Sequence, residues 1–177
     1  MKKKIKWIIP IALLLISASI MGIWAYLTSH DKATNKITYG GVTVKIEEVF
    51  EPPSLLEPGT SFTKDVKVKN LGPSDAYVRV FAVFSDSEME EYCTVDWNTT
   101  DFVYNTEDGY WYYKHKLSAE GDASITTSLF TTVTVSDEIP EDKIKDFEIL
   151  VYAEGFQSEG FETYEEAWEF CRNHPET

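Results

Sequence analysis

Hydrophobic and polar residues alternate along most of the chain beyond residue 36. In the segment 37–50, the apolar residues Val42, Val44 and Ile46 are separated by polar neighbours. Successive side chains of a β-strand point to opposite faces, so this alternation is typical of a strand with one buried face. Four further segments show alternation or a run of β-branched residues: 62–70, 76–84, 124–135 and 147–156. The pattern predicts an all-β fold.

Turn-forming residues interrupt these segments at short intervals. The interruptions are "EPGT" (57–60), "NLGPSD" (70–75), "NTEDG" (105–109) and "AEGD" (119–122). Gly, Pro, Asn and Asp favour the backbone angles that tight turns need. Short strands separated by such turns predict an antiparallel β-sandwich over residues 37–160.

The C-terminal part, residues 161–177, has a helical pattern instead. Thr163 precedes Glu166 by three residues, which is the spacing of a capping box at a helix start. The apolar residues that follow recur at helical spacing: Ala167, Phe170 and Cys171 on one face, with Trp168 at its edge. We expect a short helix over 164–173 that ends before Pro175. It should lie over one edge or end of the sandwich, because a bare sheet edge invites pairing with another chain.

Residues 1–25 have the three-part layout of a secretory signal peptide. Four lysines lie within the first six residues, an apolar stretch follows, and small residues come near its end. Cleavage after Ala25 makes Tyr26 the first residue of the exported chain. The apolar run 7–27 is also about long enough to span a bilayer, so an uncleaved anchor helix is the alternative. Under both hypotheses the chain meets the membrane only through this segment, and the rest is secreted or displayed on the cell surface.

The chain is strongly acidic, with 30 Asp and Glu against 16 Lys and Arg and a formal net charge of −14. Such a surface repels phosphate backbones, which argues against a nucleic-acid partner. We interpret the acidity as a source of solubility outside the cell, and binding of calcium or another hard cation is the alternative. The sequence predicts no cofactor.

The chain has two cysteines, Cys93 and Cys171. They do not form a CxxC motif, and no histidine lies at metal-ligand spacing from either. In an exported protein they are a candidate disulfide pair. Two buried thiols are the alternative.

Four segments in order carry a family resemblance. They are "GIWAYLTSHDKATNKITYGG" (22–41), "LEPGTSFTKDVKVKNLGPSDAYVRV" (56–80), "GYWYYKHKLSAEGDASITTSLF" (109–130) and "VYAEGFQSEGFETYEEAW" (151–168). Their order and spacing resemble the TasA/camelysin family of exported proteins. The resemblance implies cleavage near Tyr26 by a dedicated signal peptidase of the SipW type and a jelly-roll-like β-sandwich. It also implies a structural role in the extracellular matrix of a biofilm, although this chain lacks the long insertions of the large matrix members.

The resemblance further implies assembly into fibres by strand addition. The polar leader 26–36 would act as a donor strand that completes the sheet of a second copy. Tyr26, Leu27 and Ile37 are the candidates for filling pockets there, and the leader contains no Pro or Gly that would prevent an extended conformation. A flexible leader without this role is the alternative.

Camelysin relatives are labelled metallo-endopeptidases, so a secreted metalloprotease is the second functional hypothesis. A catalytic zinc needs about three protein ligands and a base for the attacking water. His30, His115 and His174 lie in separate parts of the chain, and no HExxH motif occurs. The acidic runs 90–93 and 165–169 are typical of solvated faces. We therefore predict a non-catalytic protein.

The aromatic run "GYWYYKHK" (109–116), together with Trp97, raises the third hypothesis, a surface adhesion or glycan-binding module. Aromatic residues favour strands, and strand alternation predicts that one set of rings is buried and the other exposed. We favour the interpretation that these aromatic residues belong mainly to the hydrophobic core. "NTT" (98–100) matches an N-glycosylation acceptor, which we interpret as incidental.

Overall fold

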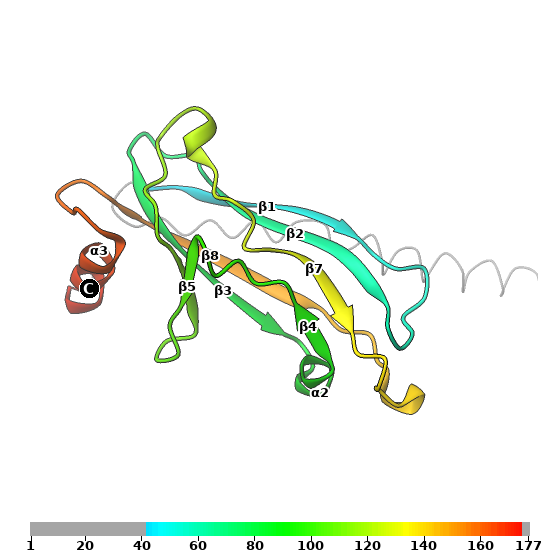
Figure 1. Cartoon of the computed structure of the whole chain (residues 1–177). Helices are drawn as coiled ribbons and strands as arrows, with labels where there is room; N and C mark the ends of the chain where they lie inside the picture. Colours follow the sequence, from blue (N-terminus) through cyan, green and yellow to red (C-terminus); the bar gives the residue numbers. More distant parts are fainter. Residues whose placement is uncertain (1–41, 175–177) are drawn as a thin grey trace, which may run out of the picture. The chain divides into compact units, whose positions relative to one another are not determined.

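The computed structural model describes residues 42–174. These residues form two four-stranded antiparallel sheets that share one hydrophobic core (Figure 1). The all-β sandwich predicted from the alternating pattern is confirmed. The signal segment, the polar leader and Pro175 lie outside the described residues.

Sheet A has the strand order β1-β2-β7-β4, and sheet B has the order β5-β6-β3-β8. The strands of sheet A are β1 (Val44–Glu51), β2 (Ser61–Asn70), β7 (Phe130–Val135) and β4 (Cys93–Val95). The strands of sheet B are β5 (Phe102–Tyr104), β6 (Tyr110–Tyr113), β3 (Ala76–Phe84) and β8 (Ile149–Gln157). Only β1–β2 and β5–β6 are consecutive neighbours, so the other pairings join segments far apart in the sequence.

The turns fall where the sequence predicts them. In the β5–β6 hairpin, Gly109 donates its backbone N–H to the Asn105 carbonyl. Its φ of 76° is one that side chains with a Cβ rarely adopt. A Cβ at Gly109 would also lie 3.1 Å from the ring of Phe81, so glycine is needed here both for the turn and for the close packing.

Alternation along each strand builds the core between the sheets. The inward residues Val66 and Val68 of sheet A meet Val78 and Val80 of sheet B, and all four are fully buried. Each buried aliphatic side chain of this kind contributes about 1.5–3 kcal/mol relative to an exposed one.

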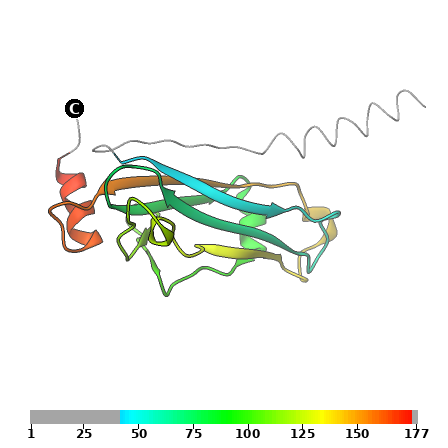
Figure 2. The same ribbon diagram turned by 90° about the horizontal axis from the view of Figure 1, so that it is seen from above.

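The two sheets approach each other most closely where β1 begins beside β8 (Figure 2). A Cβ at Gly155 in β8 would lie 2.6 Å from Val44 Cγ1 and 2.7 Å from Val42 Cγ1. Glycine at this position therefore lets the start of β1 pack directly onto the backbone of β8.

Four short helical segments complete the described structure: α2 (Ser87–Glu91), the 3₁₀ turns Asp122–Ser124 and Glu141–Lys143, and α3 (Tyr164–Asn173). The sequence patterns do not predict α2, a single turn capped by the Asp86 carboxylate. The predicted bounds of α3 and its cap are confirmed, because Thr163 Oγ1 accepts the Glu166 N–H at 3.3 Å.

The predicted buried face of α3 needs correction, whereas its predicted place at one end of the sandwich is confirmed. Phe170 is 45% exposed, whereas Trp168 is 1% exposed and Ala167 fully buried. The helix packs through Trp168 and Ala167 on the outer face of sheet B, near one end of its strands, where it contacts β3 and the edge strand β8 (Figure 1). Within residues 42–174, no helix has the length and apolar character needed to cross a bilayer.

Candidate interaction surfaces

Among the described strands, the sheet edges differ sharply in length. β4 and β5 have three residues each, whereas β1 has eight and β8 has nine. Very short edge strands are one of the devices by which proteins avoid unwanted pairing. The long edges of β1 and β8 therefore offer the two main rows of backbone groups for another strand.

The backbone groups that β1 presents outward can be assigned from its pairing with β2. Leu71 donates its N–H to the Thr43 carbonyl at 2.7 Å, directly before the β1–β2 ladder begins. Hydrogen-bonded and non-hydrogen-bonded pairs alternate along an antiparallel ladder. The N–H and C=O groups of every second residue of β1 therefore point away from β2: Val44, Ile46, Glu48 and Phe50.

The side chains of β1 make this edge charged at some positions and apolar at others. Lys45, Glu47, Glu48 and Glu51 carry charges. The Lys64 ammonium of β2 pairs with Glu48 and lies 5.2 Å from the centre of the Phe50 ring. Val49 and Phe50 are 55% and 45% exposed, so apolar surface remains open at the end of β1.

The outward backbone groups of β8 follow from the same reasoning. Bonds from the Ser158 N–H to the Asp75 carbonyl and from the Ser85 N–H to the Glu148 carbonyl flank the β3–β8 ladder. By alternation, the outward groups belong to the odd-numbered residues of β8: Ile149, Val151, Ala153, Gly155 and Gln157.

A cluster around Arg79 holds α3 on sheet B. The guanidinium lies 2.6 Å from a Glu154 carboxylate oxygen and 4.4 Å from the Trp168 ring. Arg79 Nη1 donates to the Tyr112 hydroxyl at 3.1 Å, and that hydroxyl donates to Asp108. Burial disfavours the charge on Arg79, but the bonds to Tyr112 and Glu154 outweigh it and raise the pKa. The cluster is a partly buried network of ion pairs and hydrogen bonds that joins β3, its neighbours and the helix.

Burial also raises the pKa of every tyrosine in this region. The pKa of Tyr164 is raised to about 12, mainly by burial and then by its bond to Glu165. Tyr77, Tyr110 and Tyr112 shift in the same direction, with burial as the largest cause. Beneath α3, burial therefore disfavours the ionised form of these tyrosines.

The aromatic run 109–116 contributes to both faces of sheet B. Trp111 and Tyr113 face the core, where Trp111 stacks on Trp97 at 4.7 Å between ring centres. The prediction of core packing is confirmed for them. The expected exposure of the other rings is wrong for Tyr112, which is 3% exposed because Tyr164 and Trp168 of α3 cover it.

The histidines and acidic runs do not assemble into a metal site among residues 42–174, where no group of three potential ligands converges. His115 lies 3.4 Å from Asp101, and His174 Nδ1 lies 3.0 Å from the Phe170 carbonyl. His30, like the donor-strand candidates Tyr26, Leu27 and Ile37 and the cleavage position after Ala25, lies outside the described residues.

Asn98 of the "NTT" acceptor is held by its neighbours. Its Nδ2 donates to Asp101, Thr127 and Ser128 at 3.0–3.2 Å, and its Oδ1 accepts the N–H groups of Thr100 and Asp101. A glycan on Nδ2 would break these bonds, so the amide has a structural role in this turn.

The candidate disulfide is absent from the structure, which has no bond between Cys93 and Cys171. Cys93 is the first residue of β4 and packs near Val135, whereas Cys171 belongs to α3 and packs beneath the other end of sheet B. β4 and α3 lie at opposite ends of the sandwich (Figure 1). Burial raises the pKa of the Cys93 thiol to about 11.

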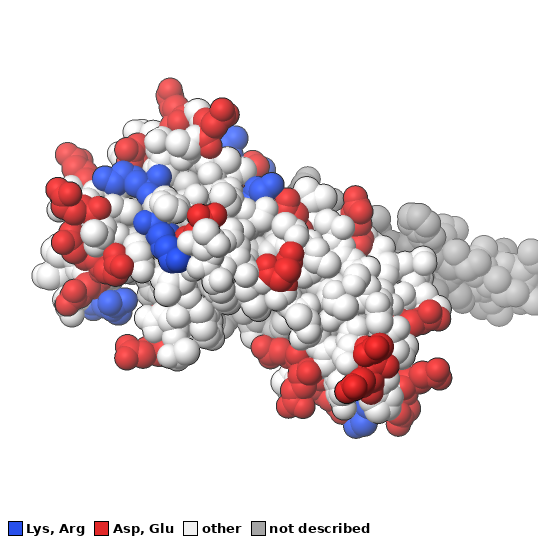
Figure 3. Space-filling view, viewed as in Figure 1, with Lys and Arg blue, Asp and Glu red and all other residues white. Residues whose placement is uncertain are grey.

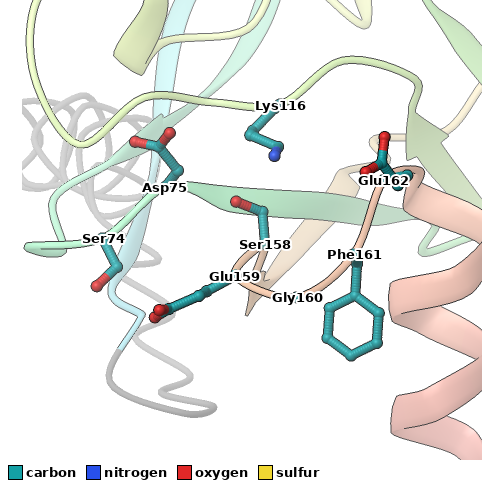
Figure 4. Close-up of a pocket in the computed structure, with 8 residues that line it drawn as sticks. All are labelled: Ser74, Asp75, Lys116, Ser158, Glu159, Gly160, Phe161 and Glu162. Carbon is teal, nitrogen blue, oxygen red and sulfur yellow. The ribbon is translucent and has the colours of Figure 1, made fainter.

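Two shallow hollows lie side by side among the loops near α3. One, of about 460 Å³, has Asp75 and Lys116 on one side and the turn 158–162 on the other (Figure 4). The second, of about 780 Å³, lies between the loops 71–75 and 118–120 and shares Asp75. Asn70 fixes these loops by donating to the carbonyls of Ser74 and Ser118.

Comparison with known proteins gives no relative: no protein-family model matches the sequence, and no curated protein matches it.

Proposed function

We propose that this chain is an exported, non-catalytic structural protein of the extracellular matrix or cell surface, and that it assembles through its sheet edges. The observation that carries the proposal is the eight-residue edge of β1, on whose outer side no described strand pairs and where Val49 and Phe50 are exposed. Strand addition uses main-chain hydrogen bonds for affinity and side-chain pockets for specificity. β1 offers both.

The donor in this proposal is the segment 26–37 of a second copy, released by a signal peptidase of the SipW type. The segment carries His30, Lys32 and Lys36 against the single acid Asp31, whereas β1 carries one lysine and three glutamates. The two strands are therefore complementary in charge, which favours this pairing over a pairing of two β1 edges. Tyr26, Leu27 and Ile37 supply the apolar side chains.

A jelly-roll-like arrangement is part of the same proposal. Eight strands in two four-stranded sheets, with β2–β7, β4–β7, β3–β6 and β3–β8 as neighbours, support it. The edge strands β1 and β5 pair with β2 and β6 in local hairpins. β1 is thus an edge strand of the sandwich, and a donor strand from a second copy can reach it without crossing the core.

The test is an in-frame deletion of residues 28–36, which keeps Ala25 and Tyr26 for cleavage. Cells that export the unaltered chain should release protein that starts at Tyr26 and forms filaments in electron micrographs. The deletion variant should be released equally well but form few or no filaments. Unchanged filament yield would exclude the donor role, and a released chain that starts at Met1 would exclude cleavage.

A synthetic peptide of residues 26–37 provides a second test. Added in excess to released protein, it should occupy the β1 edge and shorten the filaments, whereas a peptide of the same composition in scrambled order should not. Peptidase activity that a chelator abolishes would instead establish the metalloprotease hypothesis.

A further inference from the structure

Among residues 42–174, β8 shows few of the devices that protect a long edge strand, although α3 lies over Phe156 near its end. It has nine residues, no proline, and Glu154 as its one charged side chain. Arg79 pairs with that carboxylate within the same subunit. β1, by contrast, carries four charged residues, and β4 and β5 are only three residues long. Long, apolar, uncharged edges are those that pair with other chains.

We infer that the β8 edge pairs antiparallel with the β8 edge of a second copy, which joins two B sheets into one. A two-fold axis at Ala153, the middle residue of the strand, gives the longest overlap. The odd-numbered residues, whose N–H and C=O groups point outward, then face each other in hydrogen-bonding pairs. This pairing goes beyond the proposed function, since it uses a different edge and needs neither cleavage nor the N-terminal segment.

The side chains fit this register. On the outer face, Tyr152 lies opposite Glu154 of the partner subunit, and Leu150 lies opposite Phe156 of the partner subunit. No two like charges meet, although each chain has a net charge of −14. Leu150 and Tyr152 are 38% and 39% exposed in the single subunit, and the pairing covers them. A second copy therefore covers the apolar surface of this edge without placing like charges directly opposite each other.

The experiment compares variants of the full chain by sedimentation velocity in a mild detergent. The unaltered chain should dimerise with increasing concentration. In the dimer, Tyr152→Glu places a new carboxylate of each copy opposite Glu154 of the other copy. Because these like charges repel, we expect the dissociation constant to rise on the order of tenfold. Tyr152→Lys instead faces that carboxylate with an ammonium, so its dimer should be at least as stable as that of the unaltered chain.

The matched control is Tyr104→Glu, which changes a tyrosine of similar exposure on the opposite edge of the same sheet. It should leave the dimer unchanged and so exclude a general effect of added charge or of the apolar N-terminal segment. Hydrogen exchange provides an independent measurement. Dimerisation should slow exchange at the amides of Val151, Ala153 and Gly155 but not at those of Ile46 and Glu48.

Three results would overturn the inference. They are a chain that stays monomeric at all concentrations, equal weakening by Tyr104→Glu and Tyr152→Glu, and protection that appears on β1 instead of β8. Filament formation is measured separately through the 28–36 deletion, which should leave the β8 dimer intact, so a failure of either proposal can be told from a failure of the other.

Discussion

At the scale of single residues, Arg79 joins five side chains of the α3 contact: Glu154, Asp108, Tyr110, Tyr112 and Trp168. It interrupts the apolar alternation of β3 in the sequence, where it stands between Val78 and Val80. That interruption indicates that Arg79 points away from the core. It does not indicate that another element covers the guanidinium, because the covering helix lies more than 80 residues later in the chain. The sequence therefore could not reveal that Arg79 is a partly buried ion-pair partner beneath α3.

We predict that Arg79→Met lowers the free energy of unfolding by about 1–3 kcal/mol, because it leaves the partly buried Glu154 carboxylate without its charged partner. Adding Glu154→Leu to the same chain should restore part of the loss. Chemical denaturation measures both effects. The exposed Lys145→Met variant is the control and should change stability by less than about 1 kcal/mol; an equally large loss there would refute a special role for Arg79.

The cysteines give a second prediction at this scale. With the pKa of Cys93 at about 11, its thiolate is scarce near pH 8. Alkylation of Cys93 in the folded protein should be slow and should become fast in denaturant without any reductant. If the thiol in denaturant reacts only after a reductant is added, the protein contains a disulfide that the structure lacks.

At the scale of elements, the strands and α3 were predictable and their partners were not. The segments 62–70 and 76–84 lie within one residue of β2 and β3, because period-two alternation is a local property. β4 and β5 have only three residues, too few for a period to be visible. The predicted buried face of α3 was wrong because Phe170 and Trp168 are both large and apolar, so the sequence does not distinguish them. Trp168 is the buried one because it contacts Arg79 and Tyr112.

The helix gives a direct test of that contact. Trp168→Ala should release α3 from sheet B, since a buried tryptophan contributes about 3–5 kcal/mol. Phe170→Ala, on the same helix but 45% exposed, should have a much smaller effect. Hydrogen exchange across residues 164–173 measures the release. Equal exchange in the two variants would show that Trp168 does not anchor the helix.

Alkaline pH should loosen the same element. The ordinary pKa of tyrosine is 10.0 and that of Tyr164 in the fold is about 12. As the pH rises through this interval, the unfolded chain loses the proton first, so the folded state binds more protons and stability falls. The contribution of Tyr164 to the stability of the folded state is complete below pH 10 and is lost as the pH approaches 12. Tyrosinate absorbance and exchange at α3 measured together should change over this range, whereas loss of α3 contacts below pH 9 would contradict the assignment.

At the scale of the whole molecule, charge is distributed unevenly. Acidic side chains gather around α2 and toward the ends of the strands, while the middle of the face in Figure 3 carries few charges. Two copies with a net charge of −14 repel each other at long range and attract only over short distances, through apolar contacts and backbone bonds.

Salt should therefore strengthen the β8 dimer. Raising the ionic strength from about 0.01 M to about 0.15 M shortens the screening length from roughly 30 Å to roughly 8 Å. The dissociation constant measured by sedimentation should fall over this range. A dissociation constant that rises with salt would show that ion pairs between the copies stabilise the dimer. This would contradict the inference that the pairing depends on apolar contacts and backbone bonds.

The position of β8 near the end of the chain has a consequence for how the protein is made. β3 is an inner strand of sheet B, and its longer neighbour is β8. It therefore lacks this neighbour until residues 149–157 have been synthesised. A nascent chain cannot close its core while the last quarter is still inside a ribosome or a translocation channel. Because the core depends on pairing between distant segments, folding is slow. The chain therefore remains unfolded for almost the whole of its synthesis.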